Sequence, residues 1–507
     1  MRLWWLVIAI LAALALGACK MGPDYKRPET SSGDAWRLAP TTAESIANLP
    51  WWELLRDSIL QGLIRTALGE NLDLRVAVAT IEQYQAQLVI TRFDLAPSVQ
   101  ATGQGLYVHS TQDAIGIPTG SGIVPFPLSS SRSGGTDFGA EFGGAGINWE
   151  LDLWGRIRRS IEAAQAQLLG QVENQRTIVI GLVSNVAQAY FELRGLDLQI
   201  DITKRTLTAW DESVRLSRIR FQHGDIPKLD LNQFEAERAS TAAQLADLEQ
   251  QAVQKENQLS VLLGHRPMSI PRGIALTDQI MPPEVPPGLP SDLLQRRPDI
   301  LMAEQALAVA TANIGVAQAQ RFPTLSLTGR AGVSAVQLTG VAGQGPFGTF
   351  AALGGLSAPL FNATALGFQV KANEAQMRQA LVSYQRTILS AFQDVENALI
   401  VVQKSREKRA AQEQQVEALQ SALTFATQRY QGGRASYLDL LTAQRSLFSA
   451  ELSLADTRRS QLTAMVQLYK SLGGGWLPEG RPDGPAGGTP MSRVPVSEVA
   501  SGHSRLN

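Results

Sequence analysis

The stretch RFQHGDIPKLDL, residues 220–231, returns near the other end of the chain as RYQGGRASYLDL, residues 429–440. The two stretches align without a gap at an offset of 209 residues, and six of their positions are identical. The same register places Val186 on Val395, far outside the matched window. A long unit is therefore duplicated within the chain, and we predict a pseudo-symmetric architecture with two copies of it.

The duplication extends toward the N-terminus, where NLDLRVA at residues 71–77 corresponds to RPDILMA at residues 297–303 with an offset of 226. Farther along the chain the offset falls to 207, so the first copy contains 19 additional residues. Residues 110–137 are rich in Ser, Gly and Pro, and their counterpart around residues 340–348 is short. We predict a surface loop of variable length there.

The N-terminus has the form of a secretory signal. Arg2 precedes an apolar run, residues 3–16, which is short for a membrane-spanning helix and ends in Leu-Gly-Ala before Cys19. Cys19 is the only cysteine, and a lone cysteine can be a buried or a reactive thiol. In this position it resembles the acylation site of a bacterial lipoprotein, with residues 1–18 as the signal peptide. By the same resemblance, Lys20 favours the outer membrane.

Composition excludes several classes of protein. The net charge is −1, so nothing suggests a nucleic-acid partner. We find no other apolar run long enough to cross a bilayer as a helix, so a membrane-spanning part would have to be a closed barrel of strands. The four histidines show no metal-ligand spacing, and no nucleophile elbow or phosphate loop occurs. We therefore predict no enzyme activity, no metal site and no cofactor.

Long coiled-coil helices are expected in both halves. No proline lies between Pro127 and Pro227 or between Pro359 and Pro478. Apolar residues inside these spans recur in steps of four and three, which is typical of coiled coils. The longest segment would measure roughly 100 Å. The expected helices cover residues 155–222, 228–263, 363–431 and 436–472.

Two strand candidates precede each long helix. They alternate apolar with small or polar residues over about ten positions, which is a weak signature of outer-membrane strands. Edge strands of a soluble sheet are the alternative, and the lipoprotein signal favours the membrane. Four strands cannot close a barrel around a pore, so several chains would have to contribute. The candidates are residues 96–108, 138–153, 322–338 and 347–360.

Five motifs in order resemble those of a known family, the outer membrane factors or TolC-like outer-membrane efflux proteins, in their lipoprotein branch. The resemblance covers about residues 19–475, and one departure is Ser58, where the family usually has proline. The motifs are GPDYKRP at residues 22–28, WWELLRD at 51–57, WELDLWG at 149–155, RPDI at 297–300 and APLF at 358–361.

The resemblance implies a fold in which a membrane β-barrel continues into a long α-helical coiled-coil barrel. Each chain would supply a duplicated strand-strand-helix-turn-helix unit with four strands, and a homotrimer would close a 12-stranded barrel. The expected parts are a lipid-anchored equatorial segment at residues 19–70, repeats at 71–275 and 291–475, a Pro-rich linker at 276–290 and a disordered tail at 476–507.

The function that the resemblance implies is a passive exit duct in the cell outer membrane. It would export drugs or other small toxic compounds delivered by a periplasmic adaptor (membrane fusion) protein and an inner-membrane pump of the resistance-nodulation-division type. Two alternatives stay open: a type I secretion channel for proteins, and a structural coiled-coil lipoprotein tether.

Glycines mark the expected helix turns. Gly224 and Gly433 follow the long helices, and a tight turn there needs a residue that can adopt a positive φ. In the resembled family these turns form the periplasmic tips that meet the adaptor.

Two aspartates, Asp230 and Asp439, lie six residues after those glycines. A solvated helix face is the plain interpretation of such residues. The resemblance instead implies that they line a closed aperture, where rings of like charge would favour cations.

A second set of candidate gating residues lies beside the later turn. Tyr430 matches a family tyrosine that ties neighbouring coiled coils together. Ala435 and Thr442 depart from the family pattern, which has arginine and aspartate there in its best-known channel, and Arg434 is the candidate replacement for that arginine.

Overall fold

The computed structural model describes residues 20–29, 36, 51–110, 114–119, 122–127, 136–279, 290–338 and 344–474, all within one compact unit. The predicted signal peptide, Cys19, the tail, and residues 280–289 of the predicted linker lie outside the described residues.

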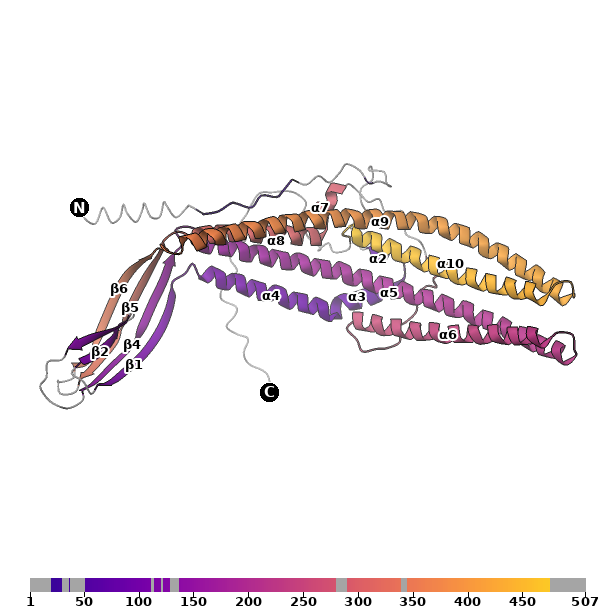
Figure 1. Cartoon of the computed structure of the whole chain (residues 1–507), viewed down its shortest axis with the longest axis horizontal. Helices are drawn as coiled ribbons and strands as arrows, with labels where there is room; N and C mark the ends of the chain where they lie inside the picture. Colours follow the sequence, from indigo (N-terminus) through magenta and orange to yellow (C-terminus); the bar gives the residue numbers. More distant parts are fainter. Residues whose placement is uncertain are drawn as a thin grey trace. The chain divides into compact units, whose positions relative to one another are not determined.

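Two helical hairpins are the largest elements (Figure 1). In each, a long helix turns tightly into an antiparallel partner about half as long, and α10 also packs on α5, which joins the hairpins. The residues that alternate in steps of three and four along the second hairpin, such as Ile388, Ala391 and Val395, are buried as the periodicity predicts. The helices are α5 (Arg156–Gln222), α6 (Lys228–Leu262), α9 (Ala363–Gln431) and α10 (Tyr437–Ser471).

A further helix precedes the strands in each copy: α4 (Leu72–Phe93) and α8 (Pro298–Ala319). The duplicated unit is therefore helix-strand-strand-helix-turn-helix, and the predicted unit lacked its first helix. The side chain of Asn71 caps α4, and Pro298 occupies the first turn of α8, which are both ordinary helix starts. Helix α4 packs against α5, and α8 packs against both α5 and α9.

Helix α8 also corrects the expectation that no apolar helix follows the N-terminal run. Among the described residues, it is long and apolar enough to cross a membrane by length and composition. It packs against both α5 and α9, and it buries Ile300, Leu307 and Ile314. A helix covered on two sides is apolar because it is a core helix of the bundle.

Four antiparallel strands form one sheet in the order β1-β4-β5-β6, so the central pair joins the two copies. A second sheet is the hairpin of β2 (Ala114–Thr119) and β3 (Gly122–Pro127), which lies inside the segment predicted to be a loop. The prediction missed it because Gly and Pro interrupt its short apolar alternation. The four strands are β1 (Ser98–Ser110), β4 (Thr136–Leu151), β5 (Thr324–Leu338) and β6 (Gln344–Ser357).

The sheet has one apolar and one polar face. Because side chains alternate along a strand, Val99, Ile147 and Phe350 share one face, and they are 67%, 47% and 81% exposed. The other face is mainly polar and carries Gln100 and Arg330, together with Leu353, which is 70% exposed. Large apolar side chains exposed on a whole sheet face are typical of membrane strands.

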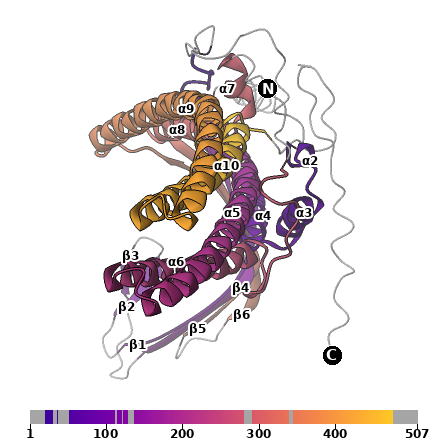
Figure 2. The same ribbon diagram turned by 90° about the vertical axis from the view of Figure 1, so that its right-hand side faces the viewer.

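The largest core cluster joins α5 and α10 to the short N-terminal helices α2 (Trp51–Leu54) and α3 (Ser58–Glu70) (Figure 2). Trp51 stacks on Tyr469 with the ring centroids 5.3 Å apart, and Tyr190 of α5 is fully buried. The short helices η2 (Pro290–Asp292) and α7 (Leu293–Arg296) lead into α8.

Candidate functional site

The two hairpin turns have the backbone that their glycines predict. Gly224 has a φ of 83° and Gly433 a φ of 68°. In both turns a backbone N–H reaches back to the last helical turn: Asp225 donates to the carbonyl of Arg220 and Arg434 to that of Arg429, each at 2.8 Å. These bonds satisfy carbonyls that would otherwise be orphaned at the helix ends.

Behind the turns, an aromatic cluster joins the two hairpins of one chain. The ring of Phe234 meets that of Tyr437 edge-on at 5.4 Å, and Trp210 packs on Phe234. The Arg220 guanidinium lies 4.7 Å from the centre of the Tyr430 ring, a cation–π contact between the hairpins. The two hairpins of one protomer are therefore in contact behind their turns.

Asp439 is placed as a helix cap. Its carboxylate accepts from the backbone N–H and the hydroxyl of Ser436 at 3.0 and 2.9 Å, and its own N–H donates to the Ser436 hydroxyl at 3.3 Å. This reciprocal pair is a capping box at the start of α10. The local pattern Ser-x-x-Asp carries the signal for this cap. An aperture role stays a prediction.

Asp230, the counterpart of Asp439 in the first copy, takes no part in a capping box. The residue at the start of α6 is Pro227, whose side chain cannot cap the helix. Partial burial raises the pKa of Asp230. Burial also raises the pKa of Tyr437, and the carboxylate of Asp230 adds to that rise. Asp230 therefore lies near the tip of the other hairpin.

The structure shows where Tyr430 and Arg434 lie, but it does not test their predicted gating roles. The Tyr430 hydroxyl is buried and has no hydrogen-bond partner among the described residues. Arg434 is exposed, and its backbone carbonyl accepts from the Arg429 side chain at 3.4 Å. Tyr430 contacts the other hairpin of the same chain through Arg220, but its hydroxyl makes no bond to that hairpin among the described residues, so both gating roles stay predictions.

A second candidate site is the surface of α5 and α8 that binds the N-terminal segment, residues 20–29. The sequence analysis did not predict this site. Arg159 on α5 is 1% exposed and donates to the carbonyls of Met21 and Gly22, both at 2.9 Å. It also pairs with Asp24 at 2.9 Å and with Glu162 at 2.8 Å. One buried guanidinium thus holds three residues that follow the predicted lipidation site.

The surface that binds the N-terminal segment continues along α8. Gly22 has a φ of 89°, and a Cβ on it would lie 2.4 Å from the Cα of Gly315, so this approach needs glycine. Farther on, Tyr25 donates to Glu304 at 3.1 Å, and Arg27 pairs with the same carboxylate at 2.9 Å. The GPDYKRP motif is therefore a strap bound to the bundle.

The strap begins at the junction of strands and helices. A Cβ on Gly155, between β4 and α5, would lie 3.1 Å from the Cα of Lys20. There Trp154 stacks on Phe322 at 4.7 Å and donates to the carbonyl of Pro323 at 2.8 Å. Cys19 is the next residue outward and lies outside the described residues.

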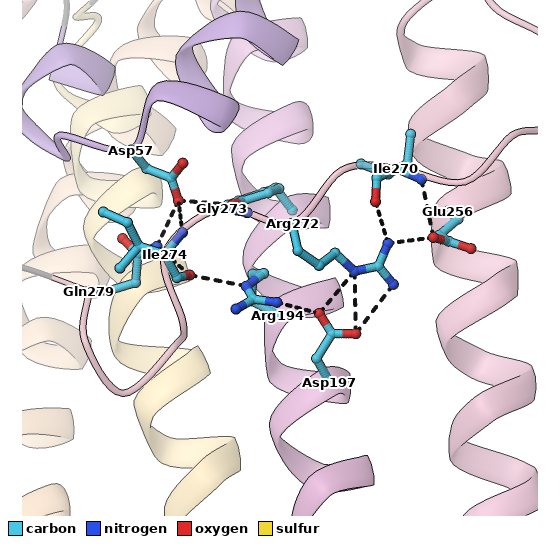
Figure 3. A network of polar contacts seen from close by, with 10 residues as sticks. Asp57, Arg194, Asp197, Glu256, Ile270, Arg272, Gly273, Ile274 and Gln279 are labelled. Atoms are coloured by element: carbon cyan, nitrogen blue, oxygen red, sulfur yellow. Dashed lines mark hydrogen bonds and ion pairs between the residues drawn. The ribbon is translucent and has the colours of Figure 1, made fainter.

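A buried polar network organises the middle of the bundle (Figure 3). Asp57 is 1% exposed; it caps α3 and accepts from the Tyr190 hydroxyl at 2.8 Å, the Gln279 amide at 2.9 Å and the Ile274 N–H at 3.2 Å. Burial and the Asp57 carboxylate raise the pKa of Tyr190. Proline in place of Ser58 would also suit this helix start, so the departure is harmless.

Arg272 completes the network from the loop after α6. It pairs with Asp197 at 3.0 Å and with Glu256, while Arg194 donates to the same Asp197 at 2.7 Å. These contacts bind the loop to α5 and α6, so the network is structural. In the described part of the chain, no three metal-ligating side chains gather at one point.

The family model "Outer membrane efflux protein" matches residues 63–265 and 289–474, one segment for each copy. A probable efflux pump outer membrane protein, TtgC of Pseudomonas putida, is 36% identical over 476 residues, which is 92% of this chain and 94% of that protein. A cation efflux system protein, CusC of Escherichia coli, is 31% identical over 474 residues, which is 93% of this chain and 98% of that protein.

Solved structures are similar over the same length. The outer-membrane channel OprN has a TM-score of 0.78 at 29% identity and covers 91% of this chain and 100% of its own. The open state of the Neisseria gonorrhoeae MtrE outer membrane channel has a TM-score of 0.76 at 30% identity, covering 90% and 99%.

Proposed function

Because the chain belongs to the outer membrane efflux protein family, whose members are outer-membrane channels for efflux, we propose that three copies of it form a passive exit duct for small toxic compounds. The resemblance found in the sequence is thereby confirmed at the level of the family, the fold and efflux across the outer membrane. Trimer formation, lipidation, the exported compounds and the partner proteins are the parts that we propose.

The observation that carries the proposal is the two-faced sheet with open edges. It exposes mainly apolar side chains on one face and mainly polar side chains on the other. Among the described strands, β1 and β6 each have no partner on their outer side in this sheet. A membrane requires every backbone group to be paired, so these edges must meet other copies. Three chains provide 12 strands, enough to enclose a channel.

The substrate class is inferred from the relatives. Their names specify toluene, antibiotics and cations as exported material. A wide duct selects little, so the pump would choose the cargo. We propose a periplasmic adaptor at the hairpin tips and a pump of the resistance-nodulation-division type in the inner membrane.

The N-terminal strap supports lipidation at Cys19. The contacts of Arg159 hold Lys20 at the strand–helix junction, where the sheet enters the membrane in the proposed arrangement. An acyl chain on the preceding residue would then reach the membrane directly. Cys19→Ser should abolish acyl labelling while the strands still insert, because one lipid anchor adds little to a closed barrel.

Deletion of the gene tests the function. Loss should sensitise cells to toluene and amphipathic antibiotics, and the intact gene should restore resistance. Cross-linking in mild detergent should stop at three chains. A type I secretion outlet would instead cause loss of a secreted protein with unchanged sensitivity, and a coiled-coil tether would leave the membrane fraction once its lipid is removed.

A further inference from the structure

The polar face of the sheet contains a basic hollow. A depression of about 300 Å³ is lined there by residues of β1, β4 and β5. In the strand register, Gln100, Gly146 and Arg330 stand in one row across these strands, with Ala351 of β6 next in the row. Gly146 has no side chain, so it leaves a gap between Gln100 and Arg330.

The neighbouring row adds neutral hydrogen-bonding groups. Ser98, Asn148 and Thr328 lie across the same three strands, and all of them line the hollow. Guanidinium, amide and hydroxyl groups therefore surround the bottom of the hollow, which is formed by Gly146. We call these residues, together with Gln100, Gly146 and Arg330, the Arg330 cradle.

Arg330 is exposed and available for a ligand. Within the part of the chain whose side chains the structure describes, no carboxylate pairs with it. The nearest described acid on this face, Glu150, is already engaged by Arg156 through two bonds at 3.1 and 2.9 Å. An arginine fork with no acidic partner is suited to bind a carboxylate at two points.

The position of Arg330 along β5 decides which side it faces. It stands on β5 between Leu327 and Val333, which are exposed apolar residues of the opposite face, so it lies at the level of the apolar band that outer-membrane barrels present to lipid. A charge facing lipid at that depth is costly. Most of the exposed apolar residues, such as Val99, Ile147 and Phe350, lie on the opposite face, and Leu353 of β6 is the exception among the described residues. Arg330 therefore faces the interior of the proposed barrel.

We propose that the Arg330 cradle binds carboxylate groups of solutes inside the channel, and that three copies form a basic ring there. The inference rests on the proposed trimeric duct. Such a ring favours anions, whereas acidic rings at the tips would favour cations. The duct would then recognise carboxylate-bearing compounds at its membrane end. This binding site is distinct from the aperture at the tips.

The test uses the full-length protein in planar lipid bilayers with citrate as the probe. Wild-type current should be blocked by citrate, and Arg330→Gln should weaken that block at least about tenfold, the effect of losing a charge-assisted hydrogen bond. Arg330→Glu should abolish citrate block and shift ion selectivity toward cations. Gly146→Val should also weaken the block by filling the bottom of the hollow while Arg330 remains.

Arg266→Gln is the matched control, because it removes the same charge from an exposed position in the loop after α6. It should leave citrate block unchanged. Equal block in wild type, Arg330→Gln and Arg330→Glu channels would overturn the cradle and leave the duct standing. A wild-type protein that cross-links only to one or two chains in mild detergent would contradict the trimeric duct itself, and the cradle with it.

Discussion

A single buried guanidinium determines where the N-terminal strap lies. Arg159 is enclosed by two backbone carbonyls and two carboxylates, so its charge is compensated inside the bundle. A buried charge is tolerated only with such partners, and removal of one member leaves the others unsatisfied. The residue therefore contributes to stability and also positions the segment that precedes it.

Arg159→Met should lower the free energy of unfolding by about 3 kcal/mol, since it breaks a buried ion pair and releases Met21 and Gly22. It should also speed tryptic cleavage after Lys20 and Lys26, because these exposed lysines would then lie in a segment released from the bundle. Arg156→Met is the matched control: its pair with Glu150 is about one-third exposed, so a cost below about 1 kcal/mol is expected. Thermal unfolding in detergent and tryptic mapping measure both, and equal melting of the two variants would refute the assignment.

The positive φ of Gly433 in the later turn leads to a second prediction for a single residue. A Cβ on Gly433 would meet nothing within 4 Å, so Gly433→Ala costs only the left-handed backbone, about 1–2 kcal/mol. Gly432, with a φ of −81°, is the control, and Gly432→Ala should be nearly neutral. If both variants melt alike, the turn does not depend on the positive φ.

At the scale of elements, one carboxylate joins α9 to α10. Glu413 accepts from Arg409 at 2.9 Å on its own helix and from Arg458 at 3.0 Å on the partner helix. The hydrogen bonds from Arg409 and then Arg458 lower the pKa of Glu413. Its pKa in the folded chain is therefore below that in the unfolded chain.

The sign of the pH dependence follows from that difference. The stabilisation by Glu413 is complete above the unfolded pKa of about 4.3 and is lost as the pH falls through the lower folded value. Glu413→Gln should destabilise by less than about 1 kcal/mol at pH 7, because the side chain is 40% exposed. The difference from wild type should shrink as the pH falls from about 6 to about 3. A difference that grows on acidification would show that the sign is wrong.

At the scale of the whole molecule, the aspartates of the tips test the proposed aperture. In a trimer, Asp230 and Asp439 would place up to six carboxylates around one throat, so Asp230→Asn with Asp439→Asn should weaken cation selectivity in planar bilayers. Asparagine keeps an acceptor for the α10 cap, which alanine would remove.

Ser436→Ala separates the two roles of Asp439. It breaks the capping box at a cost of about 1 kcal/mol and keeps the carboxylate. We expect it to lower the melting temperature and to leave selectivity unchanged. If the aspartate double variant keeps the wild-type selectivity as an intact trimer, both residues belong to a solvated helix face.

The sequence by itself determined the features that depend on local periodicity. The buried row around Val395, the turns at Gly224 and Gly433 and the four strands all follow from repeating apolar steps and from glycine at required conformations. Helix α8 escaped detection because it is apolar on nearly every side and shows no amphipathic stripe. The Asp439 cap was also readable from the local pattern.

Tertiary structure alone decided the sites built from distant residues. Asp57 meets Gln279 across 222 positions of the chain, and Arg159 meets Met21 across 138. The row of Gln100, Gly146 and Arg330 depends on strand register, which packing sets across three strands. Periodicity reports which face of an element is buried, and it carries no information on which distant side chain lies opposite. That choice is made only when the elements pack together.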